Sequence, residues 1–549
     1  MPDLLTGLGV GTGWAAGPAY RVAEAPRLPA PVPVPDPAAE ADRAVSALTT
    51  VAAELGRRAG TATDPTAAEI LRAQVMMAED PVLHEAVRAR VDAGADAPHA
   101  IDAALGEHRA AFAAAGGYLA ERVADLDDLR DRAVAVCLGE PMPGVPDPGV
   151  PFILVARDLA PADTAGLDPA RVLALVTAAG GPTSHTTIVA RALGLPAVVR
   201  CDGILDMADG TLVTVDGATG EVAVGVDADT VTDTTRREQR RRAELAATSG
   251  PGRTADGHPV ALLANIGSAA DLVDDVEGVG LFRTELLYLD RAAPPGHDEQ
   301  VAAYAKVFSA AAGRKVVLRT LDAGADKPLP FLHAGEEPNP ALGVRGLRTA
   351  RRRPEVLQGQ LAAIAQAAAA TGADVWVMAP MVTTPAEAAD FAALARATGL
   401  PTVGAMVEVP AAALRAEALL GHVDFLSIGT NDLSQYTFAA DRLCGDLADL
   451  LDPWQPALLE LIAGCARAGA AAGKPVGVCG EAAADPALAV VLTGLGVSSL
   501  SMSARSVPAV RAALAAHTVE DCRRLARAAL AAPDATAARA AASTGLAGG

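Results

Sequence analysis

The chain of 549 residues is poor in cysteine, and its six cysteines are scattered without any Cys-x-x-Cys pair. This spacing argues against a zinc site and a disulfide framework, and it is typical of a protein kept in a reducing cytoplasm. A run of eighteen apolar residues is also missing, so we expect no membrane-spanning helix. The amino terminus lacks a basic segment followed by an apolar block, and we therefore expect no signal peptide.

Positive charge is scarce as well. Lysine occurs at only four positions, which leaves arginine as the main cation, and the formal net charge is −21. This balance disfavours a general nucleic-acid-binding surface and favours partners with basic faces. The length is too great for one hydrophobic core, so we expect three or four domains.

A strand–turn–helix pattern in the first half carries the most distinctive chemistry. The apolar run 172–176 predicts a buried strand, and Gly180, Gly181 and Pro182 then break the chain. Hydroxyl residues and His185 follow, directly before a helical pattern. A helix start presents free N–H groups and the positive end of the helix dipole, which favour an anion such as phosphate. The alternative is a helix cap with an incidental histidine, and it leaves the two glycines and four hydroxyls unexplained.

Composition predicts an α/β multidomain protein with four regions. Short apolar runs in residues 1–24 and 142–226, separated by glycine, proline and aspartate, predict one discontinuous α/β domain that carries His185. The helical pattern at 36–140 predicts an inserted all-α domain of about four helices. The polar, arginine-rich segment 227–250 predicts a helical linker.

Three local signals add detail. Asp36 and Asp64 each precede a proline, which is typical of a helix start. We interpret Met76 and Met77 as core residues of the helical domain. The Ala/Gly/Ser/Thr-rich stretch from about residue 530 is expected to fray.

Residues 251–549 have a regular rhythm in which eight short apolar runs alternate with alanine-rich helical segments. This rhythm predicts a (β/α)8 TIM barrel. Polar residues gather at the carboxyl ends of the runs, where TIM barrels keep their active sites. The runs are Val260–Asn265, Val279–Arg283, Val316–Leu321, Val375–Met381, Thr402–Val409, Asp424–Ile428, Pro475–Cys479 and Ser498–Ser501.

Arginines and carboxylates dominate these strand ends. Arginines from several strands can form a bidentate cage for a phosphate or carboxylate. Glu408 and Asp432, on neighbouring strands, suit one Mg²⁺ that keeps room for substrate oxygens. Cys479 is either a reactive thiol or a small buried residue. The polar residues at or beyond the strand ends include Arg283, Glu285, Arg319, Asp322, Asp326, Lys327, Asn339, Arg345, Arg348, Asn431 and Arg442.

Five blocks of sequence resemble enzyme I of the phosphoenolpyruvate:sugar phosphotransferase system, and the resemblance covers nearly the whole chain. Residues 180–191 resemble the phosphohistidine signature of that family, and residues 427–436 resemble its second signature, on the barrel. Residues 280–285, 339–343 and 479–481 resemble further blocks of the family.

The resemblance implies a reaction and a role for each site residue. His185 is implied to accept the phosphoryl group of phosphoenolpyruvate and to pass it to a histidine of the phosphocarrier protein HPr, the first step of sugar uptake. Thr164 is implied to orient the His185 ring, and Cys479 to protonate the departing enolate. Mg²⁺ would be held by Glu408 and Asp432. Phosphoenolpyruvate would be bound by Arg283, Arg319, Arg442, Asn431 and Asp432, with support from Lys327 and Arg345.

The resemblance also implies a cytoplasmic homodimer joined through the barrel, with HPr docked on the helical insert. Because His185 and the barrel lie in different domains, transfer demands a hinge motion about the linker. One alternative is a pyruvate phosphate dikinase or phosphoenolpyruvate synthase, but the helical block is too short for the ATP-binding domain that it needs. Another is a non-catalytic sensor on the same scaffold, which the intact His185, Glu408, Asp432 and Cys479 disfavour.

Overall fold

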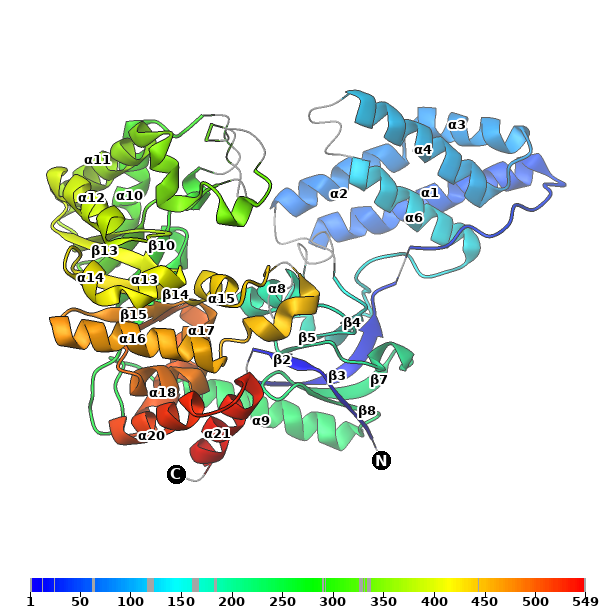
Figure 1. The fold of residues 1–549 in the computed structure, drawn as a ribbon. Coiled ribbons are helices and arrows are strands. Elements are labelled where there is room, and N and C mark those ends of the chain that lie inside the picture. Colours follow the sequence, from blue (N-terminus) through cyan, green and yellow to red (C-terminus); the bar gives the residue numbers. More distant parts are fainter. Residues whose placement is uncertain are drawn as a thin grey trace. The chain divides into compact units, whose positions relative to one another are not determined.

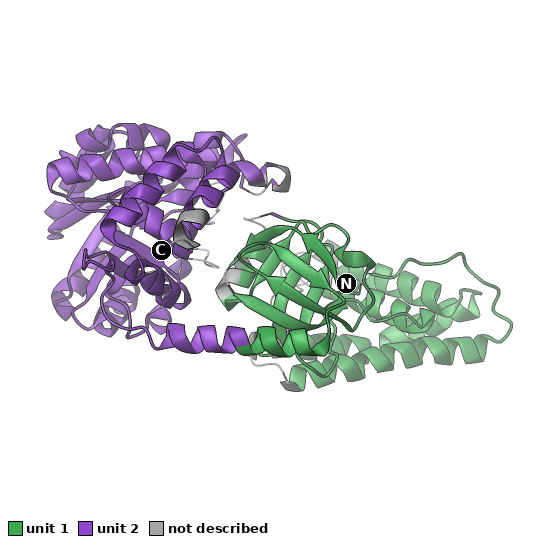
Figure 2. Cartoon of the chain, turned by 90° about the horizontal axis from the view of Figure 1, so that it is seen from below, with its two compact units in different colours: residues 1–180, 184–236 green, residues 181–183, 237–549 purple. Residues whose placement is uncertain are grey.

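The protein folds into two compact units in the computed structural model. Residues 1–180 and 184–236 form one unit, and residues 181–183 and 237–549 form the other (Figure 2). Among the described residues, no helix is long and apolar enough to cross a bilayer. The structure describes residues 2–547 except residues 12, 24, 62–64, 116–122, 160–166, 182–184, 289–290, 292, 325–328, 330, 333–336 and 443.

The first unit contains a mixed sheet whose strands are β1 (Asp3–Thr6), β2 (Leu8–Val10), β3 (Trp14–Arg21), β4 (Phe152–Ala156), β5 (Val172–Thr177), β6 (Ala197–Val199), β7 (Thr211–Asp216) and β8 (Glu221–Val224). Their order across the sheet is β1-β8-β7-β3-β4-β5-β6-β2, and the strands from β3 to β6 are parallel. Antiparallel pairs extend the sheet on both sides.

Strand β4 shows why this sheet is stable. Phe152 and Leu154 belong to one hydrophobic core, whereas Ile153 and Val155 belong to another. Successive side chains of a strand point to opposite faces, so β4 contributes to a core on each face. A strand that is apolar along its whole length is the expected sequence for this position.

A helical bundle is inserted between β3 and β4 (Figure 1). Its described helices are α1 (Pro37–Thr61), α2 (Pro65–Ala78), α3 (Pro81–Asp92), α4 (Ala97–Ala115) and α6 (Val123–Leu138). Before α1, Asp36 accepts hydrogen bonds from the backbone N–H groups of Ala38 and Ala39, both at 3.1 Å. This confirms the predicted helix start at Asp36. Asp64, the other predicted start, lies outside the described residues.

Two expectations about the bundle are wrong in detail. The described residues contain five helices where about four were expected. Met76 is 74% exposed, although Met77 packs against the bundle core. The buried face of α2 carries Gln74 and Ala78, which are four residues apart. Met76 lies about 200° around the helix from Gln74, so it points away from that face.

The predicted linker forms helix α9 (Ala228–Ala246), and the boundary between the two units falls within it. Glu238 is buried and pairs with Arg241 and Arg242 on the same helix. Most other side chains of α9 are exposed, as its polar sequence predicts.

The second unit contains a closed barrel of parallel strands, in agreement with the predicted TIM barrel (Figure 1). The observed strand ends differ from the predicted ones by two residues at most. The strands are β9 (Ala261–Ile266), β10 (Gly278–Arg283), β11 (Lys315–Arg319), β12 (Val375–Ala379), β13 (Thr402–Val407), β14 (Phe425–Gly429), β15 (Val476–Cys479) and β16 (Ser499–Met502).

Helices surround the barrel, and a separate set of side chains fills its interior. The interior cluster is Leu281, Val317, Met378, Met406, Phe425 and Cys479. The helices are α10 (His297–Ala311), α11 (Pro354–Thr371), α12 (Pro385–Ala397), α13 (Pro410–Leu414), α14 (Ala416–Leu420), α15 (Thr430–Phe438), α16 (Pro456–Ala472), α17 (Glu481–Ala484), α18 (Pro486–Gly494), α19 (Val507–Ala515), α20 (Val519–Leu530) and α21 (Ala535–Ala547).

The expectation of a frayed carboxyl-terminal stretch is wrong. Residues 535–547 form α21, and Ala538 and Ala542 are fully buried in the core around the barrel. Asp534 accepts a hydrogen bond from the backbone N–H of Ala537 at 2.8 Å and so caps the helix. Alanine has the highest helix propensity, and its small side chain allows close packing, so the simple composition of this stretch does not prevent order.

Candidate active site

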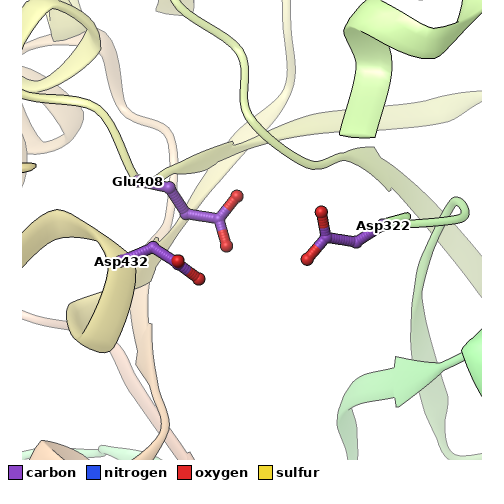
Figure 3. A group of neighbouring side chains, drawn as sticks. All are labelled: Asp322, Glu408 and Asp432. Carbon is purple, nitrogen blue, oxygen red and sulfur yellow. The ribbon is translucent and has the colours of Figure 1, made fainter. Parts of the chain in front are cut away.

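Three buried carboxylates converge at the carboxyl ends of the barrel strands (Figure 3). Asp322 lies three residues beyond β11, Glu408 directly follows β13, and Asp432 lies in the first turn of α15, which begins directly after β14. One oxygen atom from each of them lies within 4.8 Å of the other two. From the sequence we predicted only Glu408 and Asp432 as metal ligands, so Asp322 is a third candidate ligand that the sequence pattern did not indicate.

Arg345 joins two of these carboxylates. Its Nε and Nη2 atoms each donate a hydrogen bond to Asp322 at 3.1 Å, and its Nη1 and Nη2 atoms donate to Asp432 at 2.9 and 3.0 Å. The side chain is fully buried. Burial alone would lower the pKa of Arg345, but the two carboxylates outweigh it and raise the pKa. Arg345 is therefore held as a cation between Asp322 and Asp432.

Arg319, the last residue of β11, faces the same carboxylates. Its Nη2 atom donates to Glu285 at 3.0 Å, and its Nη1 atom lies 3.2 Å from Asp322 and 3.5 Å from Glu408. Within the described part of the chain, its buried Nε atom has no hydrogen-bond partner. An unsatisfied buried N–H group is costly, so this atom is suited to an oxygen of an incoming anion.

Glu408 is buried among like charges. Burial raises its pKa to about 7, with further contributions from Asp432 and Asp322 that outweigh the opposing effect of Arg319. The backbone N–H of Met381 donates to Glu408 at 2.8 Å.

Met381 itself has a φ of +55°. A bulky residue in the left-handed region costs about 1–2 kcal/mol, and such strain is often found at functional sites. In this conformation its N–H group reaches the Glu408 carboxylate.

The described charges of this cluster fit a divalent cation. Carboxylates outnumber guanidinium groups by one, and carboxylate oxygens are the ligands that Mg²⁺ prefers. The Nη1 atom of Arg442 lies 3.7 Å from Asp432, which makes it the third guanidinium group of the cluster. The carboxylates are Glu285, Asp322, Glu408 and Asp432, and the other two guanidinium groups are those of Arg319 and Arg345.

Cys479 ends β15 and is buried in the barrel interior. Its Sγ atom lies 3.4 Å from the carbonyl oxygen of Ile428 and donates to it. Burial is the main cause that raises the pKa of the thiol to about 11. At neutral pH the group is therefore a protonated thiol, which can give up a proton and is a poor nucleophile.

The remaining predicted site residues divide into two groups. Arg283 is exposed at the end of β10. Its positive charge lowers the pKa of the Cys479 thiol, against the larger effect of burial. Asn431 is exposed in the first turn of α15. Lys327 and Thr164 lie outside the described residues.

The strand and the helix predicted on either side of the turn before His185 are confirmed, and residues 182–184 of that turn lie outside the described residues. His185 is the first residue of α8 (His185–Leu193), which lies between β5 and β6 in the chain. Gly180 has a φ of +93°, which favours glycine at the turn. The next residue, Thr186, is buried and donates from Oγ1 to Asp158 at 3.1 Å, which ties the helix start to the segment after β4. The His185 side chain lies outside the described part of the structure.

Comparison with known proteins assigns the chain to a family. Family models of PEP-utilising enzymes match it three times: the PEP-binding domain at residues 241–519, the mobile domain at residues 149–220 and the N-terminal domain at residues 6–122. A phosphoenolpyruvate-protein phosphotransferase from Streptomyces coelicolor is 53% identical over 556 residues, which cover 100% of both chains. The chain belongs to the phosphoenolpyruvate-protein phosphotransferase family.

Further relatives agree with this family. A phosphoenolpyruvate-protein phosphotransferase from Haloferax volcanii is 42% identical over 84% of both chains. A multiphosphoryl transfer protein from Rhodobacter capsulatus is 41% identical over 85% of this chain and 58% of its own length. An NMR structure of Enzyme I (nEIt) is 30% identical over 43% of this chain and 99% of that one, and its TM-score of 0.35 is too low to support a conclusion. The protein is therefore an enzyme of phosphoenolpyruvate-dependent phosphotransfer.

Proposed function

We propose that the protein transfers the phosphoryl group of phosphoenolpyruvate to His185 and then to a histidine of HPr, the first step of sugar uptake by the phosphotransferase system. The observation that supports this most is the buried cluster of Arg319, Arg345 and three carboxylates at the barrel mouth. It lies within the region that matches the PEP-binding family model. The family match at residues 149–220 likewise contains His185.

In this proposal, arginines bind the phosphoenolpyruvate anion. The buried Nε atom of Arg319 would donate to a substrate oxygen, and Arg283 and Arg442 would contribute further charge. Asn431 and Lys327 would complete the contacts. Arg345 donates to Asp322 and Asp432, so its part would be to hold these carboxylates and to support the phosphate through them.

Glu408 and Asp432 would hold Mg²⁺, with Asp322 as a third possible ligand. When bound, Mg²⁺ would neutralise negative charge on the phosphate oxygens. Phosphoryl transfer needs alignment and charge stabilisation more than covalent help from the protein, and buried, preorganised side chains supply both.

His185 would act as the nucleophile through a ring nitrogen that carries no proton, oriented by Thr164. The N–P bond would form as the P–O bond of phosphoenolpyruvate breaks. The enolate that leaves would take the proton of Cys479 at its terminal carbon and become pyruvate. A second transfer would move the phosphoryl group from His185 to HPr and free the histidine.

The proposed reaction assigns a task to each region. Residues 1–24 and 142–226 would form the phosphohistidine domain, residues 36–140 would bind HPr, and residues 251–549 would bind phosphoenolpyruvate and form a homodimer. Residues 227–250 would be the hinge that lets His185 serve two sites. All of these steps would take place in the cytoplasm.

Incubation with phosphoenolpyruvate labelled in its phosphoryl group, with Mg²⁺ and without ATP, tests the first step. We expect acid-labile label on His185 and none on His185→Gln. The matched control is His297→Gln, which changes a histidine on the surface of the barrel unit and should leave labelling intact. No label on the wild-type protein, or a strict requirement for ATP, would contradict the proposal.

Addition of purified HPr to the labelled protein tests the second step. The label should leave His185 and appear on HPr. Label that stays on His185 in the presence of HPr would contradict the proposed partner without affecting the first step. A rigid crosslink between the domain of His185 and the barrel should slow HPr phosphorylation, and an undiminished rate would contradict the hinge.

A further inference from the structure

A buried side-chain amide forms hydrogen bonds with residues that follow the ends of β10 and β11. Gln360 lies in α11, and its side chain is fully buried. Its Oε1 atom accepts a hydrogen bond from the backbone N–H of Leu321 at 2.9 Å. Its Nε2 atom donates to Thr284 Oγ1 at 3.1 Å and to the Tyr304 hydroxyl at 3.2 Å. Every polar atom of the Gln360 side chain is thus bonded, which offsets the cost of burying it.

These bonds fix the segment of chain that carries two site residues. Leu321, which donates its backbone N–H to Gln360, directly precedes Asp322. Thr284, which accepts from Gln360, donates its own hydroxyl to the carbonyl oxygen of Arg319 at 3.0 Å. Gln360 therefore holds the backbone of residues 319–321 at both ends, once directly and once through Thr284.

The hydroxyl group of Thr284 is also held in one orientation by its hydrogen bonds. It is 1% exposed, and its hydroxyl has one proton, which goes to Arg319. The amide of Gln360 supplies the hydrogen bond that the Thr284 oxygen accepts. An apolar side chain at position 360 could fill the same space, but it would leave the Leu321 N–H group and the Thr284 oxygen without these partners.

We propose that Gln360 is a positioning residue for phosphoenolpyruvate binding, which acts by setting the backbone from which Arg319 and Asp322 project. The inference rests on the proposed role of Arg319 in binding the substrate. A displaced substrate-binding group loses part of the binding energy that it supplies, so a network that holds this backbone affects the affinity for the substrate.

The variant Gln360→Met tests the proposal, because it keeps the length of the side chain and removes the three hydrogen bonds. We expect the KM for phosphoenolpyruvate to rise by about tenfold, while kcat changes by less than about threefold. The control is Gln366→Met, which changes an exposed glutamine of the same helix and should leave the KM unchanged.

A second pair of variants keeps the test decisive if Gln360→Met does not fold. Thr284→Val removes the hydroxyl that joins Gln360 to Arg319, whereas Thr284→Ser retains it. We expect Thr284→Val to raise the KM and Thr284→Ser to restore it towards the wild-type value. In the double variant with Gln360→Met, the KM should rise less than the two single effects multiplied, because both changes break one network.

Two results would overturn the inference. The first is a folded Gln360→Met or Thr284→Val protein whose melting temperature falls while its KM stays at the wild-type value, which would make the network purely structural. The second is a double variant whose effects on the KM multiply. Failure of the proposed function looks different, because the wild-type protein itself would then take no label from phosphoenolpyruvate, whereas failure of this inference leaves the wild-type labelling intact.

Discussion

Arginine–carboxylate pairs occur both at the barrel mouth and on the helical bundle, with almost the same separation between charged atoms. Arg345 and Asp322 lie 3.1 Å apart at the mouth, and Arg88 and Asp42 lie 3.0 Å apart on the bundle. The side chains of the first pair are 0% exposed, whereas those of the second pair are 47% and 73% exposed. Distance alone therefore does not distinguish these two pairs, but burial does.

Burial changes what such a pair can do. Water and salt screen an exposed pair, so its net contribution to stability is small. A buried pair is strongly destabilised when one partner is removed, because the remaining charge has no solvent to stabilise it. The barrel mouth thus holds its charges in fixed positions, where in the proposed function they would bind an anion and a divalent cation. The Arg88–Asp42 pair lies on the surface of helices that are held together by their apolar core.

The largest expected difference between the barrel mouth and the bundle is produced by Asp432→Asn. The variant loses a proposed metal ligand and leaves Arg345 with one charged partner fewer, so we expect transfer from phosphoenolpyruvate to slow by about a thousandfold or more. Asp42→Asn on the bundle is the matched control and should label at the wild-type rate. Rates of acid-labile labelling at saturating Mg²⁺ give the comparison. A rate for Asp432→Asn within about tenfold of wild type would remove this carboxylate from the site.

Removal of Arg345 should have the next largest effect, this time on stability. Arg345→Met leaves Asp322 and Asp432 buried without their shared cation, and we expect a loss of about 3–5 kcal/mol in the unfolding of the barrel unit. The midpoint of its urea transition measures the change. Because the chain has two units, the transition must be followed by a probe within the barrel, such as Trp376 or Trp454. A loss below about 1 kcal/mol would place this buried pair on a level with exposed ones.

The effect of burial can also be tested through the pH dependence of the Cys479 thiol, which lies in the barrel interior. Its pKa of about 11 lies above the usual value of 9.0 because it is buried. A raised pKa stabilises the folded state below pH 9, and this stabilisation is lost as the pH rises from 9 towards 11. Alkylation of Cys479 by iodoacetamide, followed by mass spectrometry, should therefore accelerate through pH 8–10 by about tenfold per pH unit. A plateau near pH 9, as in a free cysteine peptide, would contradict a buried, protonated thiol.

The smallest effect belongs to the bundle. Arg88→Ala removes an exposed ion pair with Asp42, and we expect the stability of the bundle to change by less than about 1 kcal/mol. The difference should shrink further in about 1 M salt, where charges are screened within a few ångströms. Thermal unfolding of the two proteins at low and high salt measures it. A loss of stability above about 2 kcal/mol would contradict the claim that exposed ion pairs contribute much less than buried ones.

The periodicity of apolar residues in the sequence is sufficient to predict the strands of the barrel and the positions of their ends. The barrel strands appear as short apolar runs between helical segments, and their polar residues fall at the strand ends, so their positions are predicted to within two residues. The turn before His185 is equally local, because glycine, proline and hydroxyl residues mark it within a few positions. Local patterns of this kind depend on neighbours in the chain, which a sequence displays directly.

The arrangement of the charges depended on contacts between distant segments. Nothing near Arg345 in the sequence indicates that it bonds to both Asp322 and Asp432, 23 and 87 residues away. Asp322 was visible beyond the third barrel strand, but only the folded chain brings it to the other two carboxylates. The left-handed φ of Met381 is a further tertiary effect, since local propensity opposes it.

In the proposed mechanism, the buried charges at the barrel mouth drive transfer of one phosphoryl group from phosphoenolpyruvate to His185. Rapid mixing of the protein with excess phosphoenolpyruvate and Mg²⁺, without HPr, tests it most directly through the amount of pyruvate released. We expect a burst of one pyruvate per active chain that then stops, and no burst from His185→Gln. Continued release of pyruvate by His185→Gln would contradict it, because the phosphoryl group would then be going elsewhere.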